Sequence, residues 1–310
     1  MAAPPQCDVT GPSSVKNQII GLAAALGSSV SAAMPVPWGD SGSTVRLILE
    51  DGRILAARHL DTVDATALAT RLVARSERFE RSGVLVPTPM TVVSSADAGV
   101  WVTTPWLDGA TGASMLDDPS RCFELAAGMA DLSSLVGNVD PTDLDLDGDW
   151  AEPGRLGVVA AAWIATVQAD LDPSLAASAR KAVATFETAR SQAGTASVWH
   201  PVVVHGDFVP INVIVRPDGG LALVDLEDVH MAPRLVDLAW WGFIVRYHHP
   251  DAWAIGWPAL LVAAGIQHQA GIDLLCVAIA RLRVLERAAG ARTGEGRRRW
   301  LTRLAETAGW

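Results

Sequence analysis

The stretch HGDFVPIN, residues 205–212, followed by LALVDLED, residues 221–228, decides the fold of this chain. Between the two motifs lie an apolar run and a turn signal rich in Asp, Pro and Gly. This pattern predicts two antiparallel strands joined by a turn, which places Asn212 opposite Asp225. An amide oxygen and a carboxylate held together suit Mg²⁺, which takes hard oxygen ligands. Asp207, on the loop before Asn212, is then positioned to accept or orient a hydroxyl proton.

The order of these groups is that of a phosphoryl-transfer site. In protein kinases a catalytic Asp, an Asn five residues later and a further metal-binding Asp position the phosphates and neutralise their charge. Asp207, Asn212 and Asp225 follow that order here. The alternative is a loop and hairpin in which Asp and Asn only cap turns. The residue types and spacing of Asp207, Asn212 and Asp225, with a predicted strand, turn and strand between the last two, favour the kinase interpretation.

The same residues resemble the aminoglycoside phosphotransferase and choline kinase-like family, small-molecule relatives of the protein kinases. HGDFVPIN is similar to the family motif HGDxxxxN, VDLE at residues 224–227 to its D-x-E or D-x-D, and RLVDLAWW at residues 234–241 to the D-L-A that follows. The resemblance implies an α+β, bilobal protein kinase-like fold. We expect a small β-rich nucleotide-binding lobe at residues 1–105, with about twelve flexible residues at its start, and a larger, mostly helical catalytic and acceptor-binding lobe at residues 106–310.

Residue roles follow from the resemblance, position by position. It implies that Asp207 is the catalytic base and that Asn212 and Asp225 are the Mg²⁺ ligands. It also implies structural roles for His205 and Asp237, the latter as an anchor for the catalytic loop.

The acceptor pocket of this family is lined by the late helices, the acidic turn after the metal-binding Asp, and the C-terminus. Glu227 points the same way as Asp225 on an extended segment, so it reaches a metal-bound water or the substrate, or caps a turn. The candidates for substrate contact are Glu227, Asp228, His230, Arg246, His248 and His249.

A nucleotide-binding lobe is predicted from residues 36–107. A small polar loop at residues 39–44 precedes two strands joined by an Asp51-Gly52 turn, and a helix follows at residues 62–81. Backbone N–H groups and hydroxyls in such a loop bind phosphates, although a Gly-x-x-Gly turn also serves simply as a hairpin connection. The candidate phosphate-binding residues of this loop are Ser41, Gly42, Ser43 and Thr44.

The second strand departs from the family pattern, because a Lys is expected near its end. The chain has only Lys16 and Lys181, and neither lies there. Arg58 is the available cation, and a guanidinium binds phosphate oxygens with a different geometry from an ammonium. The alternative is a solvated strand-end arginine. The helix at residues 62–81 stands where the family has a helix with an acidic partner for this cation, and the candidates are Glu77, Glu80 and Asp64, each of which is otherwise an ordinary exposed charge.

Adenine is expected to bind backbone groups near an interlobe hinge, a position that the main chain determines. The residues assigned to it are Thr103, Thr104 and Trp106.

Composition narrows the classes of partner. The chain of 310 residues has a net charge of −10, 50% hydrophobic residues and three cysteines. The acidic balance argues against nucleic acid as a partner, and the odd, dispersed cysteines argue against a disulfide framework. No apolar run is long enough for a membrane span. We therefore expect a cytoplasmic protein, a monomer or weak dimer, that binds a cationic small molecule.

The remaining chain predicts helices at residues 121–136, 157–171, 174–192, 237–247, 253–264 and 273–288. Between the first two lies an acidic segment, residues 140–154, which partly imitates a calcium loop but has Gly154 where a bidentate Glu should stand. A calcium site, an acidic flap facing an amine and a solvated loop remain the alternatives.

Together these features predict a kinase that uses Mg²⁺ and ATP, or GTP, to phosphorylate a hydroxyl of an amine-bearing molecule, with antibiotic resistance as the leading role. One alternative is a metabolic kinase acting on an amino sugar, a choline-like alcohol or an amino-acid alcohol. Another is a non-catalytic kinase-like binding protein, motivated by Arg58 standing where Lys is expected.

Overall fold

The computed structural model describes residues 8–9, 13–36, 44–96, 98–192, 199–267 and 270–310. The chain divides into two compact units. The N-terminal unit comprises Met1–Thr111, Thr142–Asp145 and Val213–Glu227, and the C-terminal unit comprises Gly112–Pro141, Leu146–Asn212 and Asp228–Trp310. The first is built on antiparallel strands and the second is mainly helical, so the α+β class is confirmed. The lobe boundary at residues 105/106 stays a prediction, and most of the first twelve residues lie outside the described part of the chain.

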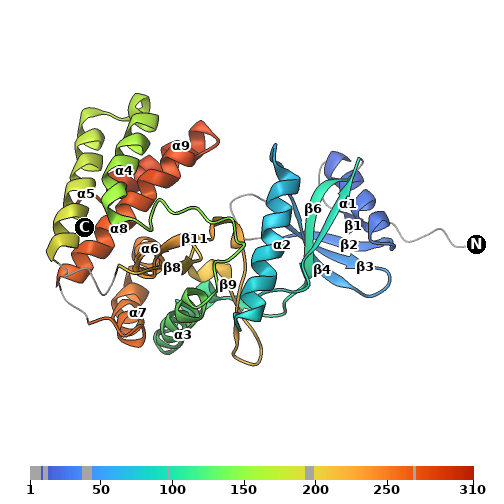
Figure 1. Ribbon diagram of the computed structural model, residues 1–310. Helices are drawn as coiled ribbons and strands as arrows, with labels where there is room; N and C mark the ends of the chain where they lie inside the picture. Colours follow the sequence, from blue (N-terminus) through green and yellow to red (C-terminus); the bar gives the residue numbers. More distant parts are fainter. Residues whose placement is uncertain (1–7, 10–12, 37–43, 97, 193–198, 268–269) are drawn as a thin grey trace, which may run out of the picture. The chain divides into compact units, whose positions relative to one another are not determined.

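A mostly antiparallel sheet forms the body of the N-terminal unit (Figure 1). Its strands are β1 (Asp8–Val9), β2 (Val30–Pro35), β3 (Thr44–Leu49), β4 (Ile54–His59), β5 (Thr91–Ser95) and β6 (Gly99–Pro105), in the order β1-β2-β3-β4-β6-β5. The predicted turn between β3 and β4 is present, and Gly52 takes φ 88° there. Arg58 lies next to the end of β4, between Thr44 of β3 and Val102 of β6.

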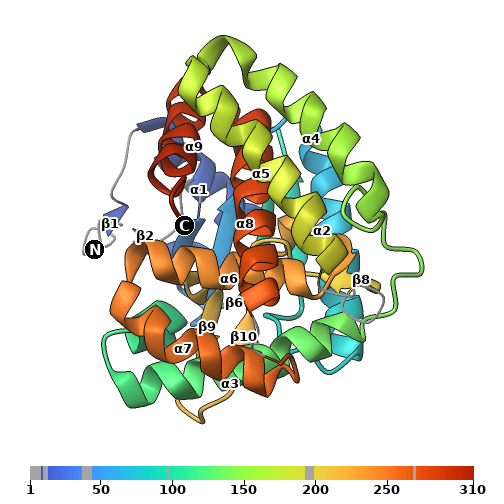
Figure 2. The same ribbon diagram turned by 90° about the vertical axis from the view of Figure 1, so that its left-hand side faces the viewer.

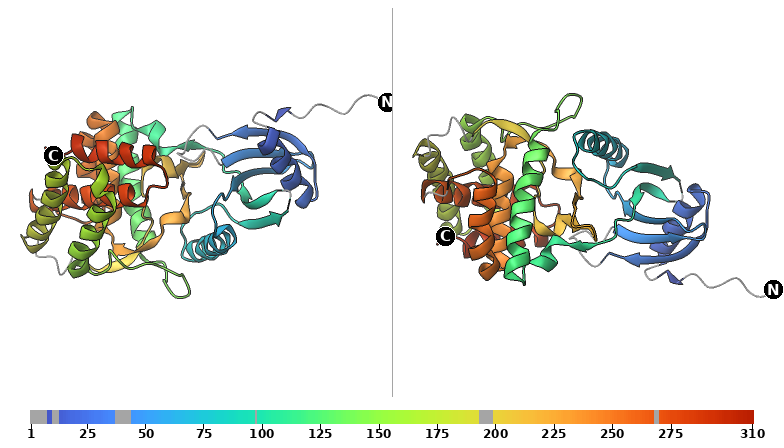
Figure 3. Two further views of the ribbon diagram at one scale, coloured as in Figure 1. Left: turned by 90° about the horizontal axis from the view of Figure 1, so that it is seen from above. Right: turned by 90° about the horizontal axis from the view of Figure 1, so that it is seen from below.

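Two helices cover opposite faces of this sheet (Figure 3). They are α1 (Ser13–Ala25) and α2 (Ala65–Arg81). Alternate residues of β3 point toward α1, and Leu47 and Leu49 pack against Ile19 and Leu22 in one buried cluster. Burying a side chain of this size stabilises the fold by roughly 1.5–3 kcal/mol. On the other face α2 buries Phe79, and the helix predicted at residues 62–81 is confirmed.

The predicted hairpin after the HGDFVPIN motif is also confirmed. Strands β9 (Val213–Val215) and β10 (Leu221–Leu223) pair antiparallel, and β9 also pairs with β7 (Ala110–Thr111). The turn closes through a hydrogen bond from the Arg216 N–H to the Gly220 carbonyl, 2.9 Å, with Gly219 at φ 83°. The pairing of Val213 with Leu223 places the start of β9 opposite the end of β10.

The C-terminal unit contains seven α-helices among the described residues and one two-stranded sheet. The helices are α3 (Pro119–Gly137), α4 (Pro153–Val167), α5 (Pro173–Gln192), α6 (Leu235–His248), α7 (Pro250–Ala263), α8 (Ala270–Gly290) and α9 (Gly294–Glu306). The two strands are β8 (Pro201–Val204) and β11 (His230–Pro233), which pair antiparallel. The short 3-10 helices of the chain are η1 (Gly112–Met115), η2 (Gln168–Asp170), η3 (Pro210–Asn212) and η4 (Leu226–Asp228).

Helix α8 runs through the middle of this unit (Figure 2) and packs against α4, α5, α6 and α9. The core around it includes Trp240 of α6, Val284 and Leu285 of α8, and Leu304 of α9. Close packing of α6 on α7 depends on Gly242, because a Cβ there would lie 2.7 Å from the Trp257 ring. Every helix predicted for this unit is present. Within the described residues, no helix has both the length and the apolarity that a bilayer crossing requires.

Candidate active site

The loop after β8 is fixed by a buried carboxylate at the start of α6. Val204 pairs with His230 of β11, and the next two residues donate their backbone N–H groups to Asp237, His205 at 2.8 Å and Gly206 at 2.9 Å. Burial raises the pKa of Asp237, while the His205 ring and the two N–H donors oppose that shift. The carboxylate therefore ties the loop directly to the α6 helix.

Gly206 has no workable substitute at its position. Its φ is 79°, and a Cβ added there would lie 2.1 Å from the carbonyl oxygen of Asp228. Its own carbonyl accepts hydrogen bonds from Arg283 and Arg287 of α8. The glycine of the His-Gly-Asp motif thus lets the chain turn beside Asp228 before it reaches Asp207.

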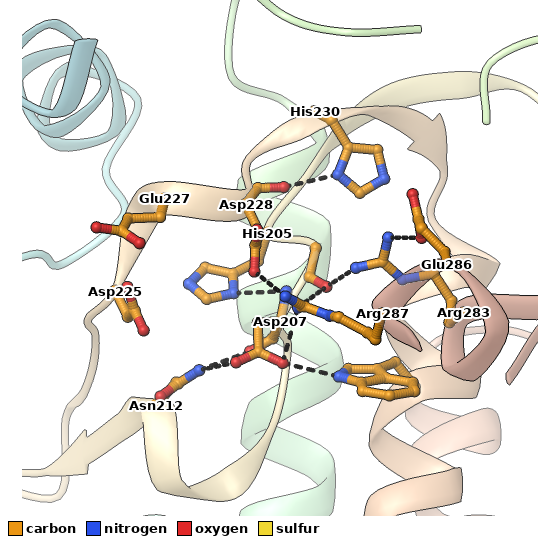
Figure 4. Close-up of polar contacts among 12 residues, drawn as sticks. His205, Asp207, Asn212, Asp225, Glu227, Asp228, His230, Arg283, Glu286 and Arg287 are labelled. Carbon is orange, nitrogen blue, oxygen red and sulfur yellow. Dashed lines mark hydrogen bonds and ion pairs between the residues drawn. The ribbon is translucent and has the colours of Figure 1, made fainter. Parts of the chain in front are cut away.

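Three side chains hold the carboxylate of Asp207 (Figure 4). Asn212 donates from Nδ2 to Asp207 Oδ2 at 2.9 Å and also to the Asp207 carbonyl at 2.9 Å. On the other oxygen, Oδ1 accepts from Trp240 Nε1 at 2.9 Å and pairs with Arg287 Nη2 at 3.2 Å. The carboxylate is therefore fixed in orientation by donors from the loop, from α6 and from α8.

Arg287 also pairs with Asp228, through Nη1 and Oδ2 at 2.6 Å (Figure 4). Although partial burial opposes the shift, Arg287 and then Arg283 hold the pKa of Asp228 below its ordinary value. Arg283 lies one helical turn before Arg287 and pairs with Glu286. Sequence reasoning missed Arg287, since an arginine in a helix far from the motif carries no local signal.

His230, another predicted substrate residue, is 8% exposed. Burial, then the charge of Arg283, lowers the pKa of His230 to about 4, so its ring is neutral near pH 7. Its Nδ1 lies 2.6 Å from the Asp228 carbonyl, which only accepts, so Nδ1 carries the proton. The other ring nitrogen, Nε2, is buried with no hydrogen-bond partner among the described residues.

In the N-terminal unit Arg58 bridges two acidic residues. Its Nη1 lies 2.8 Å from Asp225 Oδ1 and its Nη2 lies 2.9 Å from Glu227 Oε1. Although burial opposes the shift, the two carboxylates raise the pKa of Arg58. A solvated strand-end arginine is therefore the wrong description of Arg58. Within the described chain its ion pairs are with these two residues, and not with Asp64, Glu77 or Glu80.

Helix α2 contributes an arginine to this region rather than an acid. Arg75 Nη1 donates to the carbonyls of Leu226 at 2.8 Å and Glu227 at 2.5 Å. Asp225 itself has φ 65°, in the left-handed region that a residue with a Cβ seldom adopts. Such a conformation costs about 1–3 kcal/mol and is concentrated at functional sites.

The predicted nucleotide-binding residues are only partly described. Ser41, Gly42 and Ser43 lie outside the described residues. Thr103 and Thr104 are buried on β6, at 3% and 7% exposure.

Backbone hydrogen bonds show which groups the sheet uses in the segment that follows these threonines. The Trp106 N–H donates to the Ile54 carbonyl at 3.0 Å and so is already used within the sheet. Because backbone groups alternate along a strand, the carbonyl of Pro105 faces the opposite edge, beyond the first paired residue of β5, Thr91.

The residues proposed to hold Mg²⁺ have suitable chemistry. Because Asn212 uses Nδ2 to bond Asp207, its amide oxygen is directed away from that carboxylate. Asn212 immediately precedes β9, and Asp225 follows β10 after one intervening residue. An amide oxygen and a carboxylate oxygen are the donors that Mg²⁺ accepts. In the part of the chain that the structure describes, no three His, Cys, Asp or Glu side chains are placed to hold a metal ion, so the calcium interpretation of residues 140–154 gains no support.

The last predicted substrate residues lie at the far end of α6. Arg246 is stacked between two tryptophans, 4.8 Å from the ring of Trp253 and 4.3 Å from that of Trp310. His248 lies 3.4 Å from Arg303, and His249 lies 3.9 Å from Asp117. The aromatic surroundings of Arg246 were not visible in the sequence, because Trp253 and Trp310 come from separate segments.

Several solved structures are similar to this chain in fold. The structure is similar to the GDP complex of aminoglycoside 2'-phosphotransferase-IIIa, with a TM-score of 0.72, 12% identity, and coverage of 96% of this chain and 99% of the other. It is also similar to macrolide 2'-phosphotransferase MphH from Brachybacterium faecium, with a TM-score of 0.61, 15% identity, and coverage of 93% and 98%. A third similar structure is aminoglycoside phosphotransferase APH(3'')-Id from Streptomyces rimosus in complex with ADP and streptomycin, with a TM-score of 0.53, 19% identity, and coverage of 80% and 92%.

At these identities the similarity establishes the fold, and the protein kinase-like fold is confirmed. No curated protein matches the chain. The phosphotransferase enzyme family matches over residues 33–306, which is most of the sequence. The chain therefore belongs to the phosphotransferase enzyme family.

Proposed function

We propose that this protein transfers the γ-phosphoryl group of ATP, or of GTP, to a hydroxyl group of a small molecule in a Mg²⁺-dependent reaction. The observation that carries the proposal is the carboxylate of Asp207, held by Asn212, Trp240 and Arg287 on a loop that Asp237 anchors. Phosphoryl transfer requires mainly positioning and charge neutralisation, and a carboxylate fixed on three sides supplies positioning.

Asp207 orients the acceptor hydroxyl and accepts its proton. Trp240 and Arg287 both use Oδ1, whereas Oδ2 accepts from Asn212 and retains a lone pair for the incoming hydroxyl. Asn212 and Asp225 would hold Mg²⁺, which supplies neutralisation of the phosphate oxygens when it is bound.

Arg58 has a different role from the lysine of the kinase pattern. In the nucleotide-free protein it neutralises Asp225 and Glu227. With nucleotide bound, Arg58 would pair with phosphate oxygens instead of Asp225, a role for which its planar array of donors is suited.

Antibiotics that contain hydroxylated rings are the first acceptors to test. The similar structures are enzymes that, by their names, act on aminoglycosides and macrolides, and one of them was solved with streptomycin. The amine-bearing acceptor predicted from the net charge, and the amino sugars, choline-like alcohols and amino-acid alcohols of the metabolic alternative, belong in the same panel.

The test is phosphate transfer from ATP and from GTP across that panel, with Mg²⁺ present and with EDTA added. We expect a phosphorylated product from at least one acceptor, and none with EDTA or with the Asp207→Asn variant. Absence of turnover together with absence of Mg²⁺-nucleotide binding in calorimetry would contradict the proposal and favour the non-catalytic alternative.

A further inference from the structure

The C-terminal unit contains a cavity of about 260 Å³ between α6, α7, α8 and the last residue of the chain. Most of its wall is aromatic or small and apolar, and two charged side chains interrupt it. The residues that give it its character are Phe243, Arg246, Trp253, Trp257, Asp273 and Trp310.

The acidic residue of the cavity is already engaged. Trp257 Nε1 donates to Asp273 Oδ1 at 3.0 Å, and the Trp257 ring packs over Gly242, where a Cβ would lie 2.7 Å away. The missing side chain thus allows the indole to lie against α6 with its N–H turned to Asp273. This contact fixes one wall of the cavity.

Arg246, the basic residue, lies over two tryptophan rings. Its guanidinium stacks on Trp253 at 4.8 Å and on Trp310 at 4.3 Å. It makes no hydrogen bond or ion pair with any other described residue, so its in-plane N–H donors remain available. Burial lowers the pKa of Arg246, partly opposed by the charge of Asp273, but an arginine stays protonated at all ordinary pH values. A guanidinium whose N–H donors are not used by other side chains can bind a carboxylate through two hydrogen bonds.

Stacked rings connect the cavity to Asp207. Phe243, in the cavity wall, lies 5.4 Å from Trp240 with the two rings at 8°, and also 5.4 Å from Trp310. Trp240 in turn donates its indole N–H to Asp207. Phe243 of the cavity wall therefore contacts the tryptophan that holds the catalytic carboxylate.

We propose that this cavity binds a ring of the acceptor that carries a carboxylate, with the ring against Phe243 and Trp310 and the carboxylate on Arg246. The assignment rests on the proposed phosphotransferase function, because the same acceptor presents its hydroxyl to Asp207. Whole ligands occupy pockets of roughly 300–1,000 Å³, so a cavity of about 260 Å³ takes one ring system and its acidic group. An ammonium beside Arg246 would be repelled by the guanidinium, and Asp273, the acid of the same wall, already accepts a hydrogen bond from Trp257. The net charge, from which a cationic acceptor was predicted, describes the whole surface and not this cavity.

The test uses three ring compounds that differ in one group: phenylacetate, phenethylamine and 2-phenylethanol, titrated into the full-length protein by ligand-observed NMR and calorimetry. We expect phenylacetate to bind roughly tenfold more tightly than the other two. Arg246→Gln should remove that preference. Arg46→Gln is the matched control, because Arg46 also stacks on a tryptophan, 4.9 Å from Trp106, but lies in the N-terminal unit. Melting temperatures of both variants verify that they are folded.

The proposal is overturned if phenethylamine binds as tightly as phenylacetate, or if Arg246→Gln leaves the phenylacetate affinity unchanged. The readout does not depend on nucleotide or on turnover. A loss of fragment binding with intact phosphoryl transfer would remove only the cavity assignment, whereas absence of phosphoryl transfer with intact fragment binding would remove only the proposed function.

Discussion

Arg58 and Asp225, 167 positions apart in the chain, are joined by an ion pair of 2.8 Å. The same guanidinium reaches Glu227 at 2.9 Å. The carboxylate proposed to bind Mg²⁺ is thus neutralised by a protein cation in the free state. If Asp225 binds Mg²⁺ as proposed, the ion pair with Arg58 would have to open.

Arg58→Gln removes both the ion pair with Asp225 and the proposed contact with phosphate. We expect the loss of the charge-assisted phosphate contact to dominate and to weaken binding of the Mg²⁺-nucleotide roughly tenfold. Arg53→Gln is the control, because Arg53 pairs with Asp51 at the exposed turn of the same β3–β4 hairpin. Calorimetric titration of both variants provides the measurement, and an unchanged affinity in Arg58→Gln would exclude Arg58 from the phosphate site.

Arg287 positions Asp207, so its loss should affect turnover more than binding. Arg287→Met should lower kcat by about 10- to 100-fold and leave the KM for nucleotide within about twofold. The reason is that Arg287 holds the carboxylate of Asp207, and its other partners are Asp228 and the Gly206 carbonyl. Arg287→Lys should restore part of the rate. Arg281→Met controls for general destabilisation. Arg281 is a buried arginine on the same helix as Arg287, α8, and it bonds to Ser178 of α5. Equal losses in Arg287→Met and Arg281→Met would contradict a positioning role.

His230 should make the fold less stable in acid. Its pKa is about 4 in the folded protein and 6.5 as the unperturbed value, so the unfolded chain binds more protons between those values. The stabilisation is complete above pH 6.5 and is lost as the pH falls toward 4. Between pH 7 and pH 5 the loss is about 2 kcal/mol.

Urea unfolding at the two pH values, on wild type and His230→Gln, measures this effect by difference, because other groups titrate in the same range. His200→Gln, at an exposed position, is the control. If the free energy of unfolding changes equally with pH in wild type and in His230→Gln, protonation of His230 does not contribute to the acid sensitivity of the fold.

Two glycines with nearly the same φ distinguish backbone strain from steric exclusion. Gly219 has φ 83° and open space around it, whereas a Cβ on Gly206, at φ 79°, would lie 2.1 Å from the Asp228 carbonyl. Gly219→Ala should cost about 1 kcal/mol of stability and leave turnover intact. Gly206→Ala should abolish turnover, since the loop that carries Asp207 must move. Retained activity in Gly206→Ala would show that the loop tolerates a different path.

The parts predicted from sequence were those specified locally. The β9–β10 hairpin followed from two apolar runs around an Asp-Gly-Gly turn, and α2 followed from the spacing of its apolar residues. The contacts of Asp207 were not predictable in this way. Trp240 and Arg287 come from helices 33 and 80 residues further along the chain, and only the packing of α6 and α8 brings them together.

The partner of Arg58 shows the same limit. The sequence suggested an acid on α2, since that is where the family pattern has one. The helix instead supplies Arg75, whose hydrogen bonds go to the backbone after β10. Arg58 then takes the acids at the end of the hairpin, a choice that depends on how the strands and α2 are packed.

Steady-state turnover of Asp207→Asn, measured alongside Mg²⁺-nucleotide affinity, tests the central claim most directly. The substitution keeps the size of the side chain and removes its capacity to accept the proton, so turnover should fall by roughly 100-fold or more while nucleotide affinity stays unchanged. Asp225→Asn should instead weaken nucleotide binding. Wild-type turnover in Asp207→Asn would contradict the assignment of Asp207 as the group that receives the acceptor hydroxyl.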